Sequence, residues 1–493
     1  MSTQISQAIP TTHKSYPIFG LGNPQRSPFI STSDRVNCLV ELTDNGRQQA
    51  ALLGLPGLSL YATLGNLPPR GLYVREGTLT FYIVVGNQVV VAAPTQALLT
   101  IATLTTDSGP VWMDDNGTQL FINDGATPLI YTYATGVTTP ITAAGFQTGA
   151  RGGVLLQGRF WVFTPGTASN PGRVYASGQY DGLSWAALDF FTPAARPTGV
   201  LAVFRWFNDL IVVGQRSVEW WSGTPTAVAG ALGFQPSANA NTEIGGKAEL
   251  GMAGVNQRLF LVGGGEGTVG VYEIGGYNME KISPPALDAA LSALPTTSTA
   301  VCCGYMASGH ALFQLTIPGQ TTGSALTWVY DGLTGMWSKR TSFNLPYYRG
   351  LYAVHTLSSA YLTDAFTGKL YVVSESTYTE AGDPLEFEVT STHLLKEGDM
   401  LAVNKLQIDM ETGLGNAAPP GDNPQGIVQI SKDGGHTWGA ERFVPLGKVG
   451  QYTRRAQLYR LGSARDIAVK FRITEPIPRR VTGAYLIMEP GQG

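Results

Sequence analysis

The stretch Gly71–Ala93, GLYVREGTLTFYIVVGNQVVVAA, indicates the fold. It contains three short runs of β-forming residues, at Gly71–Arg75, Thr78–Val85 and Val89–Ala93. The last two runs are joined through a Val-Gly-Asn turn, and Gly and Asn accept the positive φ that a tight hairpin turn requires. The stretch therefore predicts antiparallel strands connected by hairpins.

The same pattern recurs along the chain. Further examples are VWMDDNGTQLFINDG, GGVLLQGRFWVFT, GVLAVFRWFNDLIVVG, AGVNQRLFLVGG and HALFQLTIPG. These hairpins lie about 40–50 residues apart, which is the period of four-stranded propeller blades. We therefore expect an all-β chain whose main body is a β-propeller of about six blades over residues 65–381.

The two ends of the chain differ from the propeller region in their pattern of β-forming residues. Residues 1–64 contain few periodic runs, so an extended N-terminal arm with the first strands is expected there. From 382 to 493 the strands are longer and alternate, which predicts a C-terminal domain resembling a β-sandwich. Helix signals are scarce, and Ser283–Pro295 is the best short helix, with Ser283 as its expected cap.

Composition limits the classes of function. Charged residues make up 14% of the 493 residues and the formal net charge is −3, which argues against a general nucleic-acid binder. So low a charge content suits an obligate oligomer with covered surfaces. No run is apolar enough to span a bilayer and Met1–Pro10 is not a signal sequence, so synthesis in the cytoplasm and no membrane insertion are expected. The cysteines, Cys38, Cys302 and Cys303, are expected to be buried free thiols.

One motif in the C-terminal part has a known local geometry. The Asp-box pattern S-x-D-x-G-x-T-W is formed by Ser431, Asp433, Gly435, Thr437 and Trp438. In such a turn the Asp and Ser side chains bond to backbone groups and the Trp packs under the hairpin. Asp-boxes occur in sialidases, but the arginine cluster, tyrosine and carboxylates of that chemistry are not singled out by any spacing here. A structural role is therefore favoured.

No other pattern indicates catalysis or a cofactor. The five histidines have no metal-ligand spacing, and no G-x-S-x-G elbow is present. The glycine-rich segment Val262–Gly270 lacks the residues of a phosphate-binding loop and is better explained as a hairpin. The tryptophans Trp112, Trp161, Trp206, Trp220 and Trp221 are expected in blade cores and subunit contacts, with a sugar-binding platform as the alternative. We expect no catalytic, cofactor or metal site and therefore no enzyme.

A basic stretch between Gln451 and Arg480 stands apart from the rest. It holds eight basic residues against Asp466 and Glu475, a local charge of +6. The basic residues are Arg454, Arg455, Arg460, Arg465, Lys470, Arg472, Arg479 and Arg480. They either contact an acidic partner or DNA phosphate, or they form the solvated edge of a sandwich, where charges discourage edge pairing.

Three ordered segments resemble the packaged-DNA stabilisation proteins, or tail nozzles, of short-tailed phages (podoviruses). They are Ala176–Thr226, Trp328–Ser391 and Val428–Met488, with a weaker match at VNCLVEL…LLGLPGL. The first carries Asp181, Trp185, Asn208-Asp209, Ser217, Glu219, Trp221 and Gly223, although Gly182 stands where the family often has Pro. The second carries Tyr330-Asp331, Gly335, Trp337, Arg340, Arg349-Gly350, Gly368-Lys369-Leu370-Tyr371, Tyr378-Thr379-Glu380 and Gly382, and the third includes the Asp-box.

The resemblance implies a virion protein with a mechanical role. Such a chain forms a ring, expected to be a homohexamer, below the portal and its adaptor ring. It extends the channel for double-stranded DNA without reading sequence, retains packaged DNA, anchors tailspikes or fibres, and is closed by a needle or plug. Because phosphate contacts would hold sliding DNA, the arginines of the basic stretch are expected to face the adaptor. The rival functions are a propeller glycoside hydrolase and a carbohydrate-binding protein.

Overall fold

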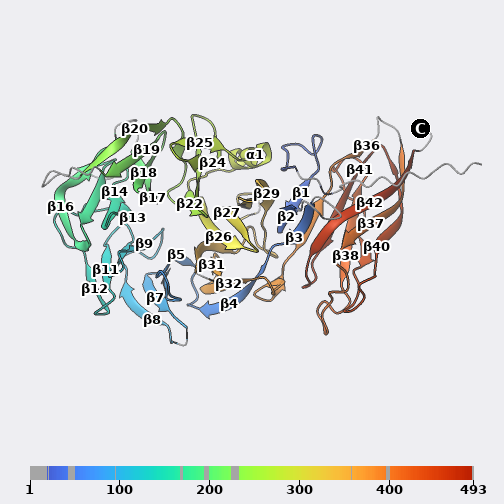
Figure 1. Cartoon of the computed structure of the whole chain (residues 1–493), viewed down its shortest axis with the longest axis horizontal. Coiled ribbons are helices and arrows are strands. Elements are labelled where there is room, and N and C mark those ends of the chain that lie inside the picture. Colours follow the sequence, from blue (N-terminus) through green and yellow to red (C-terminus); the bar gives the residue numbers. More distant parts are fainter. Residues whose placement is uncertain are drawn as a thin grey trace, which may run out of the picture.

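The computed structural model describes residues 19, 22–42, 50–94, 96–166, 170–193, 199–223, 233–321, 323–356, 358–395 and 400–490. The described chain is almost entirely β-structure and forms two bodies, a propeller and a sandwich (Figure 1). The all-β class, with a β-propeller followed by a C-terminal β-sandwich, is confirmed. In the described residues no helix is long and apolar enough to cross a bilayer.

In the described part of the chain, the propeller consists of seven blades, each an antiparallel sheet. The first two blades are β5 (Pro69–Val74), β6 (Phe81–Val85), β7 (Gln88–Ala92) and β8 (Leu99–Thr103), then β9 (Trp112–Asp115), β10 (Gln119–Asn123), β11 (Leu129–Thr132) and β12 (Val137–Pro140). The next two are β13 (Arg151–Leu156), β14 (Arg159–Phe163), β15 (Val174–Gly178) and β16 (Asp181–Phe191), then β17 (Val200–Trp206), β18 (Asp209–Gly214), β19 (Val218–Gly223) and β20 (Phe234–Thr242).

The remaining blades complete the ring. Blade five has β21 (Gly245–Gly246), β22 (Met252–Val255), β23 (Arg258–Gly264), β24 (Gly270–Gly275) and β25 (Asn278–Lys281), and blade six has β26 (Val301–Ala307), β27 (His310–Ile317), β28 (Leu326–Asp331) and β29 (Met336–Lys339). Blade seven has β30 (Gly350–His355), β31 (Ala360–Asp364), β32 (Lys369–Ser374) and, from the N-terminal segment, β4 (Gly57–Thr63). Strand β30 contacts β5, so the last blade meets the first.

The number of blades exceeds the expected six by one because of how the ring closes. Strand β4 pairs antiparallel with β32, with Leu58 opposite Val373. The seventh blade therefore has only three strands in its own stretch of sequence, and its outer strand precedes the first blade. The short strands β33 (Thr379–Glu380) and β34 (Asp383–Pro384) continue this sheet beyond β4.

The sandwich has two sheets that enclose one core. One sheet contains β2 (Cys38–Leu42), β3 (Ala50–Gly54), β42 (Arg480–Pro490), β37 (Leu401–Met410) and β40 (Ala456–Ala464). The other contains β1 (Asp34–Val36), β35 (Phe387–Thr390), β41 (Asp466–Ile473), β38 (Gln425–Ser431) and β39 (Arg442–Pro445), with β36 (Leu394–Leu395) also paired to β41. Their buried side chains, including Val40, Leu52, Val389 and Phe471, form a single cluster.

The two bodies share a sheet. Strand β1 pairs in parallel with β29 of blade six, with Val36 opposite Lys339, and antiparallel with β35 of the sandwich. A ten-stranded sheet consequently runs from the propeller into the sandwich. The arm expected over residues 1–64 thus supplies strands to both bodies, as the blue strands among the red ones show in Figure 1; residues 1–18 lie outside the described part.

The predicted helix cap, the cysteines and the tryptophans can each be compared with the structure. The helix α1 (Pro285–Ala293) lies within the predicted range, but the expected cap at Ser283 is wrong. Its hydroxyl accepts a hydrogen bond from the Val271 amide at 3.0 Å and donates one to the Asp288 carboxylate at 2.6 Å, so it connects the helix to blade five. All three cysteines are free thiols in strands; Cys38 and Cys303 are buried, whereas Cys302 is half-buried. Trp161 and Trp220 are fully buried in blade cores.

Candidate assembly interface on the sandwich

Arg479 does not belong to a surface, contrary to the expectation from the basic stretch. Only 2% of the residue is exposed. Its guanidinium donates to Leu385 O at 2.6 Å, Tyr378 O at 3.1 Å and Ile477 O at 3.2 Å. Burial lowers its pKa to about 10, although the nearby Glu380 opposes this shift. Arg479 therefore cross-links the segment between the two bodies and cannot dock a partner.

Two further arginines of the stretch are neutralised within the chain. Arg472 forms ion pairs with Glu441 and, at 3.4 Å, with Glu386. Arg480 pairs with Glu411 at 2.7 Å and remains about half exposed. Their charges are largely compensated, so they contribute less to attraction of an acidic partner than the sequence count suggests.

The other four arginines remain available. Arg454, Arg455, Arg460 and Arg465 are exposed, and no ion pair in the described structure reaches their side chains. They lie on or beside β40, the edge strand of its sheet. On the adjacent β39, the Arg442 guanidinium donates to Tyr459 O at 2.8 Å and Arg460 O at 3.4 Å, which occupies β40 carbonyls and hinders pairing of a foreign strand.

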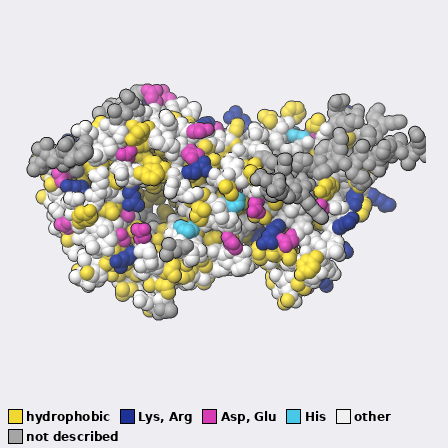
Figure 2. Space-filling model, viewed as in Figure 1, with side chains coloured by type: hydrophobic (Ala, Val, Ile, Leu, Met, Phe, Trp, Pro, Cys, Tyr) yellow, Lys and Arg dark blue, Asp and Glu magenta, His cyan; other side chains and the backbone are white. Residues whose placement is uncertain are grey.

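Aromatic side chains accompany these charges. Phe443, Tyr452 and Tyr459 are each more than half exposed along the same edge. We call Arg442, Phe443, Tyr452, Arg454, Arg455, Tyr459 and Arg460 the basic edge. Figure 2 shows Lys and Arg side chains gathered at the end of the molecule farthest from the propeller. Arginine and tyrosine together are typical of protein interfaces, but the sequence analysis singled out only the arginines.

The Asp-box is an ordinary hydrogen-bonded turn after β38. Asp433 accepts the Thr437 hydroxyl at 2.5 Å, the Thr437 amide at 2.9 Å and the Ser431 hydroxyl at 2.7 Å. These bonds, that from the Thr437 hydroxyl first, lower the pKa of Asp433 well below its usual range. Trp438 is half-buried, and the Lys470 ammonium lies 4.6 Å from its ring centre. The carboxylate is committed to the turn, which leaves no evident role in acid–base chemistry.

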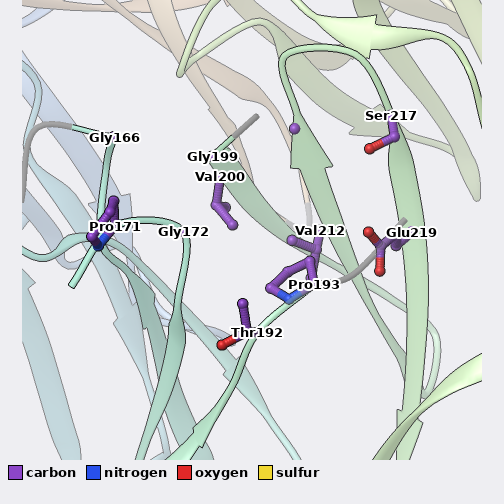
Figure 3. Close-up of a pocket in the computed structure, with 11 residues that line it drawn as sticks. Gly166, Pro171, Gly172, Thr192, Pro193, Gly199, Val200, Val212, Ser217 and Glu219 are labelled. Carbon is purple, nitrogen blue, oxygen red and sulfur yellow. The ribbon is translucent and has the colours of Figure 1, made fainter. Parts of the chain in front are cut away.

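A cavity of about 460 Å³ lies between blades three and four. Figure 3 shows Glu219 on β19, and Ser217 just before that strand, on one side of the cavity, with Pro193, Val200 and Val212 opposite. Glu219 accepts a hydrogen bond from Trp221 Nε1 at 3.2 Å. The lining within the described residues contains no second carboxylate, whereas glycoside hydrolysis uses a pair. Nor do the described residues contain a group of three or more His, Cys, Asp or Glu able to hold a metal.

Comparison with known families assigns this architecture. A model described as the bacteriophage P22 Gp10 β-propeller matches residues 16–378, and a model of the Gp10 β-sandwich matches residues 386–489. The chain belongs to the bacteriophage P22 Gp10 family. This confirms the resemblance to phage packaged-DNA stabilisation proteins and makes the chain a phage structural protein of the Gp10 type. No curated protein gives a significant match.

Solved structures are similar to this Gp10-family chain at low identity. An inactive virginiamycin B lyase from Staphylococcus aureus with quinupristin is 9% identical, with a TM-score of 0.43 over 64% of this chain and 98% of the lyase. The extracellular domain of a putative one-component system from B. thetaiotaomicron is also 9% identical, with a TM-score of 0.41 over 81% of this chain and 47% of that one. These similarities carry no functional argument.

Proposed function

We propose that this chain is the tail hub, or nozzle, of a short-tailed phage and not an enzyme. It would form a ring of six copies below the portal–adaptor assembly and extend the channel for genome ejection. It would retain packaged DNA, anchor tailspikes or fibres, and receive a needle or plug at its distal end. The observation that carries the proposal is the match of both Gp10 models, in order, over nearly the whole chain.

The way the two bodies are joined suits such a mechanical role. A sheet shared by blade six and the sandwich leaves no flexible linker at β1, and the buried Arg479 adds bonds across the segment between the bodies. A hub that transmits force between an adaptor and distal tail proteins needs two docking bodies held in fixed orientation. Neither the Asp-box nor the cavity of blades three and four supplies the paired carboxylates that a hydrolase would need.

We further propose that the basic edge docks onto the adaptor ring through an acidic surface. The docking arginines are Arg454, Arg455 and Arg460 of the basic edge together with the neighbouring Arg465, since Arg479 is buried and Arg472 and Arg480 are paired within the chain. Long-range attraction between complementary surfaces speeds association and is weakened by salt.

The decisive experiment measures mass. The purified protein is analysed by sedimentation velocity alone and after mixing with the co-encoded portal–adaptor assembly. We expect a ring on the adaptor, and we expect the combined variant Arg454→Glu, Arg455→Glu, Arg460→Glu to keep its thermal midpoint but lose docking. The combined variant Arg151→Glu, Arg216→Glu is the charge-reversal control on the propeller, where the two arginines pair with Glu249 and Glu266. A wild-type monomer that ignores the adaptor would overturn the hub proposal; docking by the triple variant would overturn the interface alone.

A further inference from the structure

One face of the propeller is built from the turns that join the first to the second and the third to the fourth strand of each blade. Hydrogen bonds between consecutive blades show that these turns lie together. Asn116 Nδ2 donates to Tyr180 O at 3.3 Å, the Tyr277 hydroxyl donates to Asp209 at 3.3 Å, and Arg258 Nη1 donates to Gly332 O at 2.5 Å. We call this surface the turn face.

Large apolar side chains stand exposed at the tips of four consecutive blades of the turn face. Tyr180 in blade three and Phe207 in blade four are 66% and 67% exposed, and Tyr277 and Leu333 follow in blades five and six at 50% and 69%. Several exposed apolar side chains on one face of a soluble protein are a candidate interaction site.

Two of these tips hold backbone conformations that favour glycine. Tyr180 has φ 56° and Phe207 has φ 50°, each in a two-residue hairpin turn. The equivalent turns at Gln157–Gly158, Asn256–Gln257 and Ser308–Gly309 reach positive φ with small or polar residues. The fold therefore does not require an aromatic residue at a tip, and bulky residues in strained conformations are concentrated at functional sites.

Acidic side chains lie near three of the tips. Asp181 and Glu280 are exposed, and no ion pair in the described structure reaches either of them. Asp209, two residues after Phe207, accepts a hydrogen bond from the Tyr277 hydroxyl at 3.3 Å, whereas Arg258 is paired with Glu273 at 2.5 Å. The three carboxylates of Asp181, Asp209 and Glu280 outnumber the exposed Arg205, two residues before Phe207, so the tips carry an excess of negative charge that is complementary to a basic partner and repels nucleic acid.

We propose that the turn face of blades three to six is a second docking surface, for a partner protein that presents Lys or Arg among apolar side chains. The proposal rests on the chain being a virion component, and it concerns a different surface from the basic edge. The partner's apolar groups would pack on Tyr180, Phe207, Tyr277 and Leu333, while its cations would meet Asp181 and Glu280. Side chains that project from the surface can enter a recess of a partner protein. A small sugar would instead need a concave site on this chain.

The test uses full-length variants and defined probes. Phe207→Gly with Tyr180→Asn removes the aromatic tips, and Asp181→Lys with Glu280→Lys reverses the charge. Each protein is mixed in turn with every other purified structural protein of the same virion and followed by sedimentation velocity. Leu188→Ser is the matched control, because Leu188 is 80% exposed on β16 rather than on a turn of this face.

We expect both double variants to weaken binding of one virion protein at least about tenfold, which is the effect of losing interface anchors. The tip variant should have an unchanged or higher thermal midpoint, since it relieves strain. Equal binding of every probe by wild type and both variants would overturn the proposal. Self-association of wild type that is lost in the variants would also overturn it, because a second copy would then occupy the face. If wild type bound no virion protein, the proposed function itself would fail.

Discussion

Two arginines of the same basic stretch, Arg454 and Arg479, differ in their exposure to solvent. Arg454 lies on an open edge in water, whereas Arg479 is surrounded by the carbonyls of Tyr378 and Leu385. The sequence shows the run of basic residues but not which of them is buried, because two of the three acceptors of Arg479 lie about a hundred residues away. A local charge count therefore overestimates the size of the docking surface.

The two arginines should respond differently to loss of charge. Arg479→Met leaves three buried carbonyls without a donor, so we expect the free energy of unfolding to fall by about 3–5 kcal/mol. Arg454→Met on the exposed edge should change it by less than about 0.5 kcal/mol. Thermal unfolding followed by circular dichroism measures both. Equal midpoints for the two variants would contradict the assignment of Arg479 as a buried tie.

A buried His–Asp pair should make stability depend on pH. His310 Nδ1 lies 2.9 Å from Asp331 Oδ2, and both residues are buried in blade six. The hydrogen bond to Asp331 raises the pKa of His310 against the opposing effect of burial. The protonated histidine thus contributes stability that is fully present below its unfolded pKa of about 6.5 and is lost as the pH rises through the higher folded value.

His310→Gln tests this linkage because glutamine cannot titrate. We expect the variant to lose about 1–3 kcal/mol at pH 6 and less at pH 9. Thermal midpoints across that range should converge with those of the wild type as the pH rises. Parallel curves would show that His310 does not titrate in the folded protein.

At the scale of elements, the sequence predicts strands joined by short turns but not the pairing of strands that are distant in the chain. The hairpin turns of blades one to six, such as the Gly-Asn turn after β6, depend on residues two to four positions apart, so the propeller could be predicted from them. The Asp-box is local in the same way. The pairing of β4 with β32 and of β1 with β29 joins segments about 300 residues apart, and no local pattern specifies it. The aromatic tips of the turn face were missed because their exposure depends on blade orientation.

Strand β4, which closes the propeller, should not tolerate a larger side chain at its first residue, Gly57. A Cβ at Gly57 would collide with the carbonyl oxygens of Thr377 and Thr379, to which β4 is fitted closely. We expect Gly57→Ala to cost about 1–3 kcal/mol through displaced backbone. Hydrogen exchange should rise in β4 and β32 while β6 stays protected.

Gly275→Ala is the control for that experiment. Gly275 has no neighbour that an added Cβ would meet, so exchange should remain that of the wild type. Uniform exchange across all blades in Gly57→Ala would mean that the propeller does not open at its closing blade.

At the scale of the molecule, Asn37 holds the propeller and the sandwich together where β1 turns into β2. It is fully buried with φ 53°. Its amide donates to Glu386 O at 2.8 Å and Thr341 O at 3.1 Å, and its carbonyl accepts the Thr341 amide at 3.1 Å. One side chain therefore satisfies backbone groups that lead into both bodies.

Replacement of this residue should uncouple the two bodies. In the wild type we expect one calorimetric transition, because the ten-stranded sheet and the Asn37 side-chain bonds together join the two bodies. Asn37→Ala should cost about 2–5 kcal/mol from the unpaired backbone groups and the strained φ, and should split the transition in two. Asn344→Ala is the matched control, since Asn344 has φ 55° but is exposed. Two transitions already present in the wild type would show that the bodies unfold independently, and the rigid hub would lose its physical basis.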